Sequence, residues 1–158
     1  MKKVLALVMM ICMLCGVAMA EEQAGDFIVM DMLGLKIWLP AGMNAVEIPE
    51  EQAAAGRLLG YEADDHTGYF VVDAVNAGEM TPDQMLANVQ ASDPEGNAQM
   101  VQVNGLTVVI YKNTAADCYT AALVDTNNNI IMFSMGPAAD ADAAAVFEYV
   151  INTLQIAE

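Results

Sequence analysis

The chain has 158 residues, of which 56% are hydrophobic and 16% are charged. Its 21 acidic residues outnumber five Lys and Arg residues, so the formal net charge is −16 at pH 7 with the single His neutral. Such a surface repels nucleic acid and anionic lipid, because those partners are bound through clustered Lys and Arg side chains. The composition therefore argues against nucleic acid as a partner and favours cationic partners or divalent cations.

The first 20 residues have the organisation of a secretory signal peptide. Lys2 and Lys3 form a positive segment, residues 4–15 form an apolar run, and Ala18-Met19-Ala20 supplies small residues for cleavage. The apolar run is shorter than the roughly 20 residues that a membrane span needs. We therefore expect cleavage after Ala20, an extracytoplasmic location and no stable membrane insertion afterwards.

Residues 21–158 then form the mature chain, and their number predicts a single domain. Cleavage removes two cations and two of the three Cys residues, so Cys118 is left without a partner for an intrachain disulfide. A lone thiol in an oxidising compartment is protected when it is buried. We place Cys118 on a buried strand face that it shares with Ala122, Ile131 and Phe133.

Paired hydrophobic segments predict four β-hairpins. The pairs are 27–32 with 35–39, 57–63 with 69–75, 98–103 with 106–111, and 118–124 with 130–135. Asn104-Gly105 is the strongest turn signal, because this dipeptide adopts the positive φ angles of a two-residue hairpin. In the first hairpin, pairing Met32 with Leu35 and Met30 with Ile37 gives an apolar face and sets Asp31 opposite Lys36.

Two amphipathic helices accompany the hairpins. Thr81 and Pro82 are a helix cap and a first helical residue, which predicts a helix over 81–92. Apolar residues at helical spacing predict a second helix over 139–155, and a short helical turn is expected at 50–55. Because a sheet with an apolar face must be covered, the fold class is α+β, with a mostly antiparallel sheet of hairpins under two helices.

The order of these elements resembles a known family. An N-terminal hairpin runs into Leu39-Pro40-Ala41-Gly42, a middle helix opens with Met80-Thr81-Pro82, the hairpin Val103-Asn104-Gly105-Leu106 follows, and a last helix ends with Ile151-Asn152-Thr153-Leu154. This pattern resembles the PsbP/Mog1-like α/β/α sandwich of small exported bacterial proteins. The resemblance implies a role as an accessory or adaptor module, since most members of that family bind other proteins.

The sequence contains no recognisable catalytic motif. Its serines, Ser92 and Ser134, do not stand in a G-x-S-x-G segment, and Cys118 has only His66 as a potential base. We therefore predict no catalytic residues, no cofactor and a non-enzymatic protein. A hydrolase that uses a scattered pair of carboxylates is a weaker alternative.

Two acidic loops suggest a second alternative, a divalent-metal-binding protein. Asp64, Asp65 and His66 lie together in one loop and could offer carboxylate and imidazole ligands. Asp125, Asn127 and Asn129 begin like a calcium loop but lack its later Gly and Glu. Ordinary solvated turns explain both segments better, because Asp and Asn favour turn conformations.

The candidate partner site lies on the first hairpin. Trp38, Val29 and Lys36 occupy the face opposite its core face in the expected register. If no helix covers them, they form an exposed apolar patch with acidic surroundings, which is typical of a protein interaction site. The expected partner is another extracytoplasmic protein; the opposite possibility is that a helix buries Trp38.

Overall fold

The computed structural model describes residues 24–140 and 142–157. The predicted signal peptide and its cleavage site at Ala20 lie outside the described residues. The strands are β1 (Gly25–Met30), β2 (Leu35–Pro40), β3 (Met43–Ala45), β4 (Arg57–Ala63), β5 (Tyr69–Asn76), β6 (Gln99–Val103), β7 (Leu106–Asn113), β8 (Cys118–Val124), β9 (Asn129–Gly136) and β10 (Gln155–Ile156). The helices are α2 (Glu50–Ala54), α3 (Pro82–Ser92) and α4 (Ala143–Asn152), with 3-10 turns η1 (Asp31–Leu33) and η2 (Pro94–Gly96).

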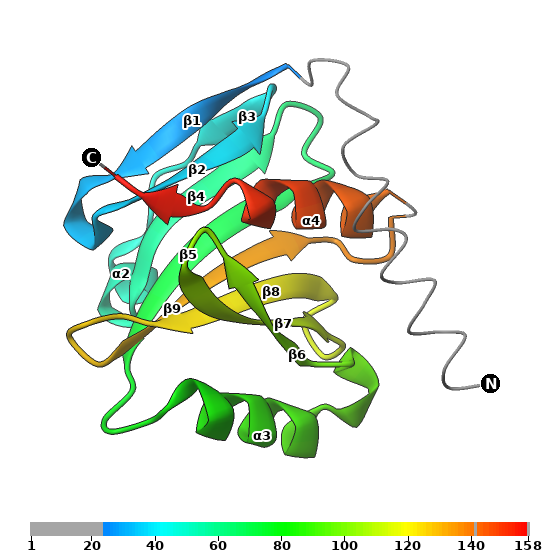
Figure 1. Cartoon of the computed structure of the whole chain (residues 1–158). Helices are drawn as coiled ribbons and strands as arrows, with labels where there is room; N and C mark the ends of the chain where they lie inside the picture. Colours follow the sequence, from blue (N-terminus) through cyan, green and yellow to red (C-terminus); the bar gives the residue numbers. More distant parts are fainter. Residues whose placement is uncertain (1–23, 141, 158) are drawn as a thin grey trace.

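The described strands form two antiparallel sheets. A seven-stranded sheet has the order β3-β4-β5-β9-β8-β7-β6, and a three-stranded sheet has the order β1-β2-β10. Helix α4 and the small sheet lie over one face of the large sheet, and α3 lies against its other face (Figure 1). The α+β sandwich of hairpins and covering helices is therefore the fold class that the sequence predicts.

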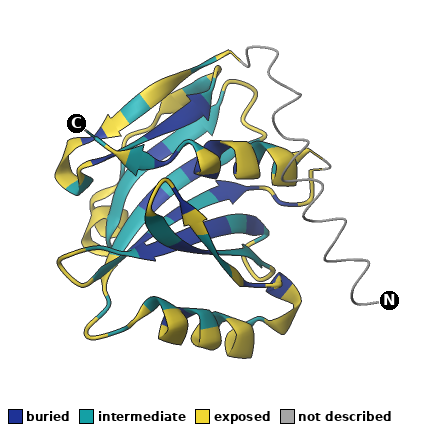
Figure 2. Ribbon diagram, in the orientation of Figure 1, coloured by how far each residue is buried: buried dark blue, intermediate teal, exposed yellow. Residues whose placement is uncertain are grey.

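The main core lies between the two sheets and α4, and Figure 2 shows buried residues along the inner strands. Its largest fully buried members are Ile37, Phe70, Val72, Val108, Ile131, Phe133, Val150 and Leu154. A smaller core beneath α3 joins Met85 to Val109 and Ala122. One face of the large sheet thus packs in the main core, and its other face lies against α3 or is open to solvent.

Several local predictions are confirmed. Val103 pairs with Leu106 around Asn104-Gly105, whose φ angles of 48° and 85° are those that the turn requires. Helix α3 begins with a capping box, in which Gln84 N–H donates to Thr81 Oγ1 and Thr81 N–H donates to Gln84 Oε1. The short helix predicted at 50–55 is α2.

The predicted register of the first hairpin is wrong by two residues. Met30 pairs with Leu35 rather than with Ile37, because the chain turns through η1 and ends it with Gly34 at a φ of 61°. A shift of two residues preserves the strand face, so Met30 stays in the core. Met32, however, lies in the turn and is 71% exposed instead of buried, and Val29 rather than Asp31 faces Lys36.

The predicted surroundings of Cys118 are also corrected. Its burial is confirmed, with 4% of the residue exposed. Ile131 and Phe133, however, pair with Leu123 and Ala121, which occupy the face opposite Cys118. Cys118 therefore lies on the α3 side of the sheet rather than in the main core.

The chain end differs from the predicted helix over 139–155. Helix α4 ends at Asn152, and β10 adds to the free edge of β2 through the pair Gln155 and Lys36. Thr153 makes the transition, because its Oγ1 accepts a 2.9 Å hydrogen bond from Trp38 N–H and donates to Val150 O. The pairing of β10 satisfies backbone groups at the edge of β2, which would stay unpaired if the helix continued to residue 155. Strand β3 likewise lies in a segment predicted to be a connector.

Candidate functional site

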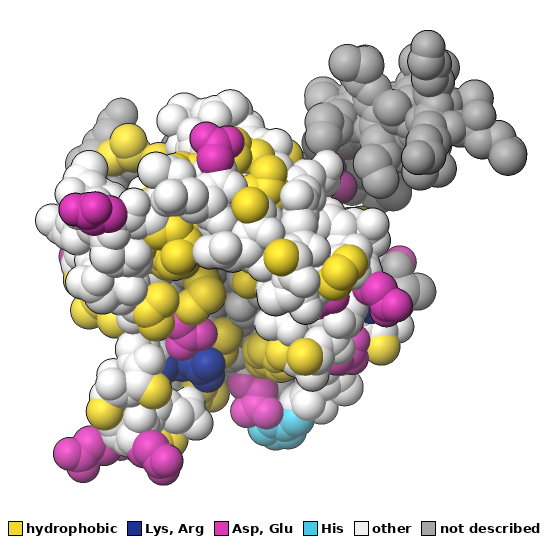
Figure 3. All heavy atoms as spheres, turned by 90° about the horizontal axis from the view of Figure 1, so that it is seen from below, with side chains coloured by type: hydrophobic (Ala, Val, Ile, Leu, Met, Phe, Trp, Pro, Cys, Tyr) yellow, Lys and Arg dark blue, Asp and Glu magenta, His cyan; other side chains and the backbone are white. Residues whose placement is uncertain are grey.

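The large sheet is hollowed on its α3 side. Helix α3 contacts β6 and β7 on this face, and beside it a hollow of about 490 Å³ lies over β4, β5, β9 and the start of β8. Figure 3 views the molecule from below, where hydrophobic, cationic and acidic side chains meet around a depression. The lining residues are Val46, Arg57, Tyr61, Glu62, Tyr69, Val71, Ala116, Cys118 and Ser134.

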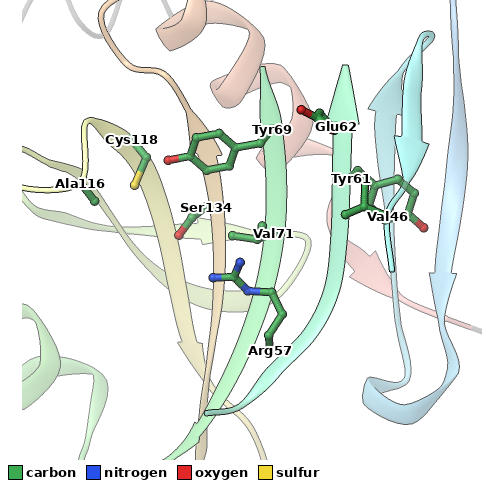
Figure 4. Close-up of a pocket in the computed structure, with 9 residues that line it drawn as sticks. All are labelled: Val46, Arg57, Tyr61, Glu62, Tyr69, Val71, Ala116, Cys118 and Ser134. Carbon is green, nitrogen blue, oxygen red and sulfur yellow. The ribbon is translucent and has the colours of Figure 1, made fainter. Parts of the chain in front are cut away.

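Tyr69 lies across the sheet in this hollow. It pairs with Gly136 of β9, and a Cβ atom on Gly136 would lie 2.6–2.7 Å from three atoms of the phenol, Cζ, Oη and Cε1. These distances place the hydroxyl end of the ring over Gly136, and Figure 4 shows the ring pointing from β5 toward Cys118. Partial burial raises the pKa of Tyr69, with Cys118 acting in the same direction. The hydroxyl of a phenol can both donate and accept hydrogen bonds.

Below the ring, a row of small polar side chains crosses from β8 to β9. Thr120 Oγ1 lies 3.0 Å from Ser134 Oγ and 3.7 Å from Cys118 Sγ. Thr120 is buried, whereas Ser134 is partly exposed and lines the hollow. The floor of the hollow thus presents the hydroxyl of Ser134, which is hydrogen-bonded to the buried hydroxyl of Thr120.

An ion pair forms one end of the hollow. Arg57 Nε donates to Asp73 Oδ1 at 2.7 Å and Nη2 donates to Asp73 Oδ2 at 3.3 Å, which is a bidentate pair. Arg57 also lines a second hollow of about 290 Å³, together with Gln52, Ala55, Asp73, Val75 and Met132. The ion pair therefore lies between two adjacent depressions on one sheet face.

A different surface is formed by the outer edge of β1. Ala41 N–H donates to Ala24 O at 2.8 Å, and hydrogen-bonded pairs alternate along an antiparallel ladder. Consequently Asp26 and Ile28 bond to β2, whereas Phe27 and Val29 direct their backbone N–H and C=O groups outward. No described strand pairs with this edge. The side chains of Phe27 and Val29 are each 53% exposed.

Trp38 does not belong to an exposed patch, because the structure buries it to 6% exposure. The ring of Tyr149 from α4 meets it edge-on at 4.9 Å between centroids. On β1, a Cβ at Gly25 would collide with the indole atoms Cζ2 and Cε2. Trp38 is therefore covered by Tyr149 of α4 on one side and fits against the backbone of Gly25 on the other. Of the predicted partner site, Val29 and Lys36 still face each other, with Phe27 as the exposed aromatic residue.

The first predicted metal loop uses its polar atoms within the loop. Asp65 Oδ1 accepts hydrogen bonds from Thr67 Oγ1 at 2.7 Å and Thr67 N–H at 3.0 Å, and these bonds lower the pKa of Asp65. His66 Nδ1 lies 3.0 Å from Glu62 Oε1. Asp64 accepts a 2.6 Å hydrogen bond from Asn44. The three residues thus turn toward different neighbours.

The second predicted metal loop is a turn of the β8–β9 hairpin. Asp125 Oδ1 accepts from Asn127 N–H and Asn129 N–H, each at 2.8 Å, and Oδ2 accepts from Asn129 Nδ2 at 3.1 Å. Within residues 24–140 and 142–157, no group of three or more His, Cys, Asp and Glu side chains is arranged to hold a metal ion. Within the same ranges, no helix is long and apolar enough to cross a membrane.

Sequence reasoning did not single out Phe27, Arg57 or Tyr69. Side chains alternate along β5, where Phe70 and Val72 lie in the core, so Tyr69 and Asp73 face the other side. The alternation therefore predicts which residues of β5 lie on the face away from the core. It does not predict that β9 pairs Gly136 with Tyr69.

The two sheets and the covering helices form an α+β fold of the PsbP-like type. No family model and no curated protein matches the sequence. Among solved structures, the chain resembles the cyanobacterial PsbP protein CyanoP of Synechocystis sp. PCC 6803, with 11% identity and a TM-score of 0.59 over 87% of this chain and 95% of that one. It also resembles a protein of Bacteroides thetaiotaomicron VPI-5482, with 16% identity and a TM-score of 0.51 over 86% of this chain and 49% of that one.

Proposed function

We propose that the protein is an extracytoplasmic, non-enzymatic module that binds a partner protein through the open edge of β1. The observation that carries the proposal is the coincidence of unpaired backbone groups and exposed apolar side chains at Phe27 and Val29. Natural sheets usually protect such edges with charged side chains, Pro or a covering segment. An extended peptide segment can pair with an open edge and gain main-chain hydrogen bonds.

The negative charge of the chain favours a partner segment that carries Lys or Arg residues. Asp26 and Asp31 are exposed near the two ends of β1, and the whole chain carries a net charge of −16. A partner strand with alternating apolar and Lys or Arg residues would pack on Phe27 and Val29 and be attracted by these acids. A second copy of the same acidic chain would be repelled. The PsbP-like fold supports an accessory role by analogy of fold alone.

A peptide-library selection tests this function. The library presents extended segments in which apolar residues alternate with Lys or Arg, and hydrogen exchange locates the site of each selected peptide. We expect new protection at the amides of Phe27 and Val29, because a bound strand accepts their outward N–H groups. Val29→Pro removes one such donor without breaking a bond to β2, and we expect at least ~10-fold weaker binding.

Val75→Ser is the matched control, since Val75 is also an exposed apolar residue on a strand but lies in the other sheet. It should bind selected peptides as the parent does. The proposal is wrong if the peptides protect another segment, if Val29→Pro binds them equally well, or if no peptide binds more tightly than ~1 mM. A stable dimer through β1 would also overturn it, because the edge would then be occupied by a second copy.

A further inference from the structure

The hollow on the α3 side of the large sheet contains a ring platform that the β1 edge does not use. The hydroxyl end of the Tyr69 ring lies over Gly136, which has no side chain, and Figure 4 shows the ring extending from β5 across β9 toward Cys118. Val71 and Ser134 continue the floor beside it. We propose that this hollow is a binding site for a neutral oligosaccharide.

The charges around the hollow select a neutral ligand. Arg57 is already neutralised by its bidentate contact with Asp73, and Glu62 adds a second carboxylate to the rim. An anionic ligand would meet these carboxylates and the field of a chain with net charge −16. The carboxylates near the hollow already have partners, since Asp73 is held by Arg57 and Glu62 Oε1 lies 3.0 Å from His66 Nδ1, so neither is left free to bind a cation. A neutral molecule needs neither a free cation nor a free carboxylate.

The polar groups of the hollow match the hydroxyl groups of a sugar. Arg57 supplies N–H donors, the Ser134 hydroxyl can donate or accept, and the Asp73 carboxylate, which lines the second hollow, accepts. Sugar hydroxyls both donate and accept, so one ring can satisfy several of these groups at once. The apolar C–H face of the same sugar packs on the face of an aromatic ring such as Tyr69.

The shape of the surface suits a chain of sugars rather than a compact molecule. The hollow of about 490 Å³ has the size of a small-molecule site. The second hollow, of about 290 Å³, begins on the other side of the ion pair between Arg57 and Asp73. A saccharide chain that stacks on Tyr69 could therefore pass the ion pair and continue toward Val75 and Met132.

The experiment is an NMR titration of the ¹⁵N-labelled protein. The probes are neutral di- to tetrasaccharides of glucose, galactose, mannose, xylose and N-acetylglucosamine, each at up to ~10 mM. At least one is expected to shift the amides of Tyr69, Val71 and Ser134. Tyr69→Leu should weaken its binding at least ~10-fold, whereas Tyr69→Phe and Tyr69→Trp keep the ring and should stay within ~3-fold of the parent.

The controls separate this site from the β1 edge and from misfolding. Phe27→Ser alters only the edge surface and should leave saccharide binding unchanged, and Tyr69→Trp shows whether a folded ring variant still binds. The proposal is overturned if no neutral saccharide shifts the hollow, or if Tyr69→Leu binds as well as the parent. Equal binding of oligogalacturonate would overturn the charge argument, and a shift of the hollow by peptides alone would assign it to peptide binding instead.

Discussion

Tyr69 and Gly136 face each other across β5 and β9, and the phenol ring occupies the space that a side chain on Gly136 would fill. An aromatic side chain that covers a cross-strand glycine shields the backbone around it and gains a flat contact. The two residues are 67 positions apart in the sequence. Their pairing gives the hollow its ring platform.

Gly136→Ala is expected to destabilise the protein by about 1–3 kcal/mol, because the new Cβ overpacks the site and the ring must move. Urea unfolding followed by circular dichroism measures the change. In Gly68→Ala the new Cβ would lie 3.6 Å from Gly136 O, an ordinary contact, so this control should be nearly neutral. If the clash is the cause, combining Gly136→Ala with Tyr69→Leu should recover part of the loss.

Trp38→Ala is expected to lower the free energy of unfolding by about 3–5 kcal/mol, as for other buried aromatic residues. The loss has a structural cause, since Trp38 packs under Tyr149 and over Gly25. Val29→Ser, at the exposed neighbour on β1, should change stability by no more than about 0.5 kcal/mol. Comparable losses in the two variants would contradict the burial of Trp38.

Asp93 is expected to contribute acid-dependent stability. The Thr114 backbone N–H, 2.8 Å from Asp93 Oδ2, is the main cause of the lowered pKa of Asp93 in the folded protein, and the Thr114 hydroxyl and Gly96 N–H add to it. A carboxyl with a lowered folded pKa stabilises above its unfolded pKa of about 3.9 and loses this contribution as the pH falls through the folded value.

Replacing Asp93 with Asn should therefore destabilise the protein at neutral pH, and the difference from the parent should shrink below about pH 4. Urea unfolding at a series of pH values measures this difference. Glu79→Gln, at another exposed acid, serves as the control for loss of one negative charge. A difference that stays constant down to about pH 2 would show that Asp93 does not act through its charge.

Asp125→Ala is expected to cost about 1 kcal/mol or more, because the N–H groups of Asn127 and Asn129 lose their acceptor. Since these bonds already occupy the carboxylate, calcium should not raise the thermal midpoint of the parent, and EDTA should not lower it. A site filled at 100 times its dissociation constant would add about 2.7 kcal/mol. A calcium-dependent rise that Asp125→Ala abolishes would restore the metal-binding alternative.

Features that depend on neighbouring residues could be predicted from the sequence. The Asn104-Gly105 turn and the Thr81 cap follow from backbone preferences that act over a few residues. Side-chain alternation along a strand is equally local, so the burial of Cys118 was predicted and is confirmed. The acidity that limits possible partners is a property of composition alone.

Features that depend on contacts between distant residues could not be predicted in this way. The first hairpin could pair in two registers with the same apolar face, and the η1 turn decided between them. Trp38 could be exposed or covered, and Tyr149 with Gly25 decided that it is buried. Asn104 shows a further link, since its side chain donates to Asn152 O and Leu154 O at the end of α4.

The sequence by itself thus determined the strands of the four hairpins, the Asn104-Gly105 turn, the α+β class and the acidic character of the chain. Only the tertiary structure decided that Tyr69 lies over Gly136, that Arg57 meets Asp73 between two hollows, and that the outer edge of β1 stays unpaired among the described strands. The reason is physical: local preferences specify how a segment folds, whereas the choice of neighbouring strands depends on packing across the whole core.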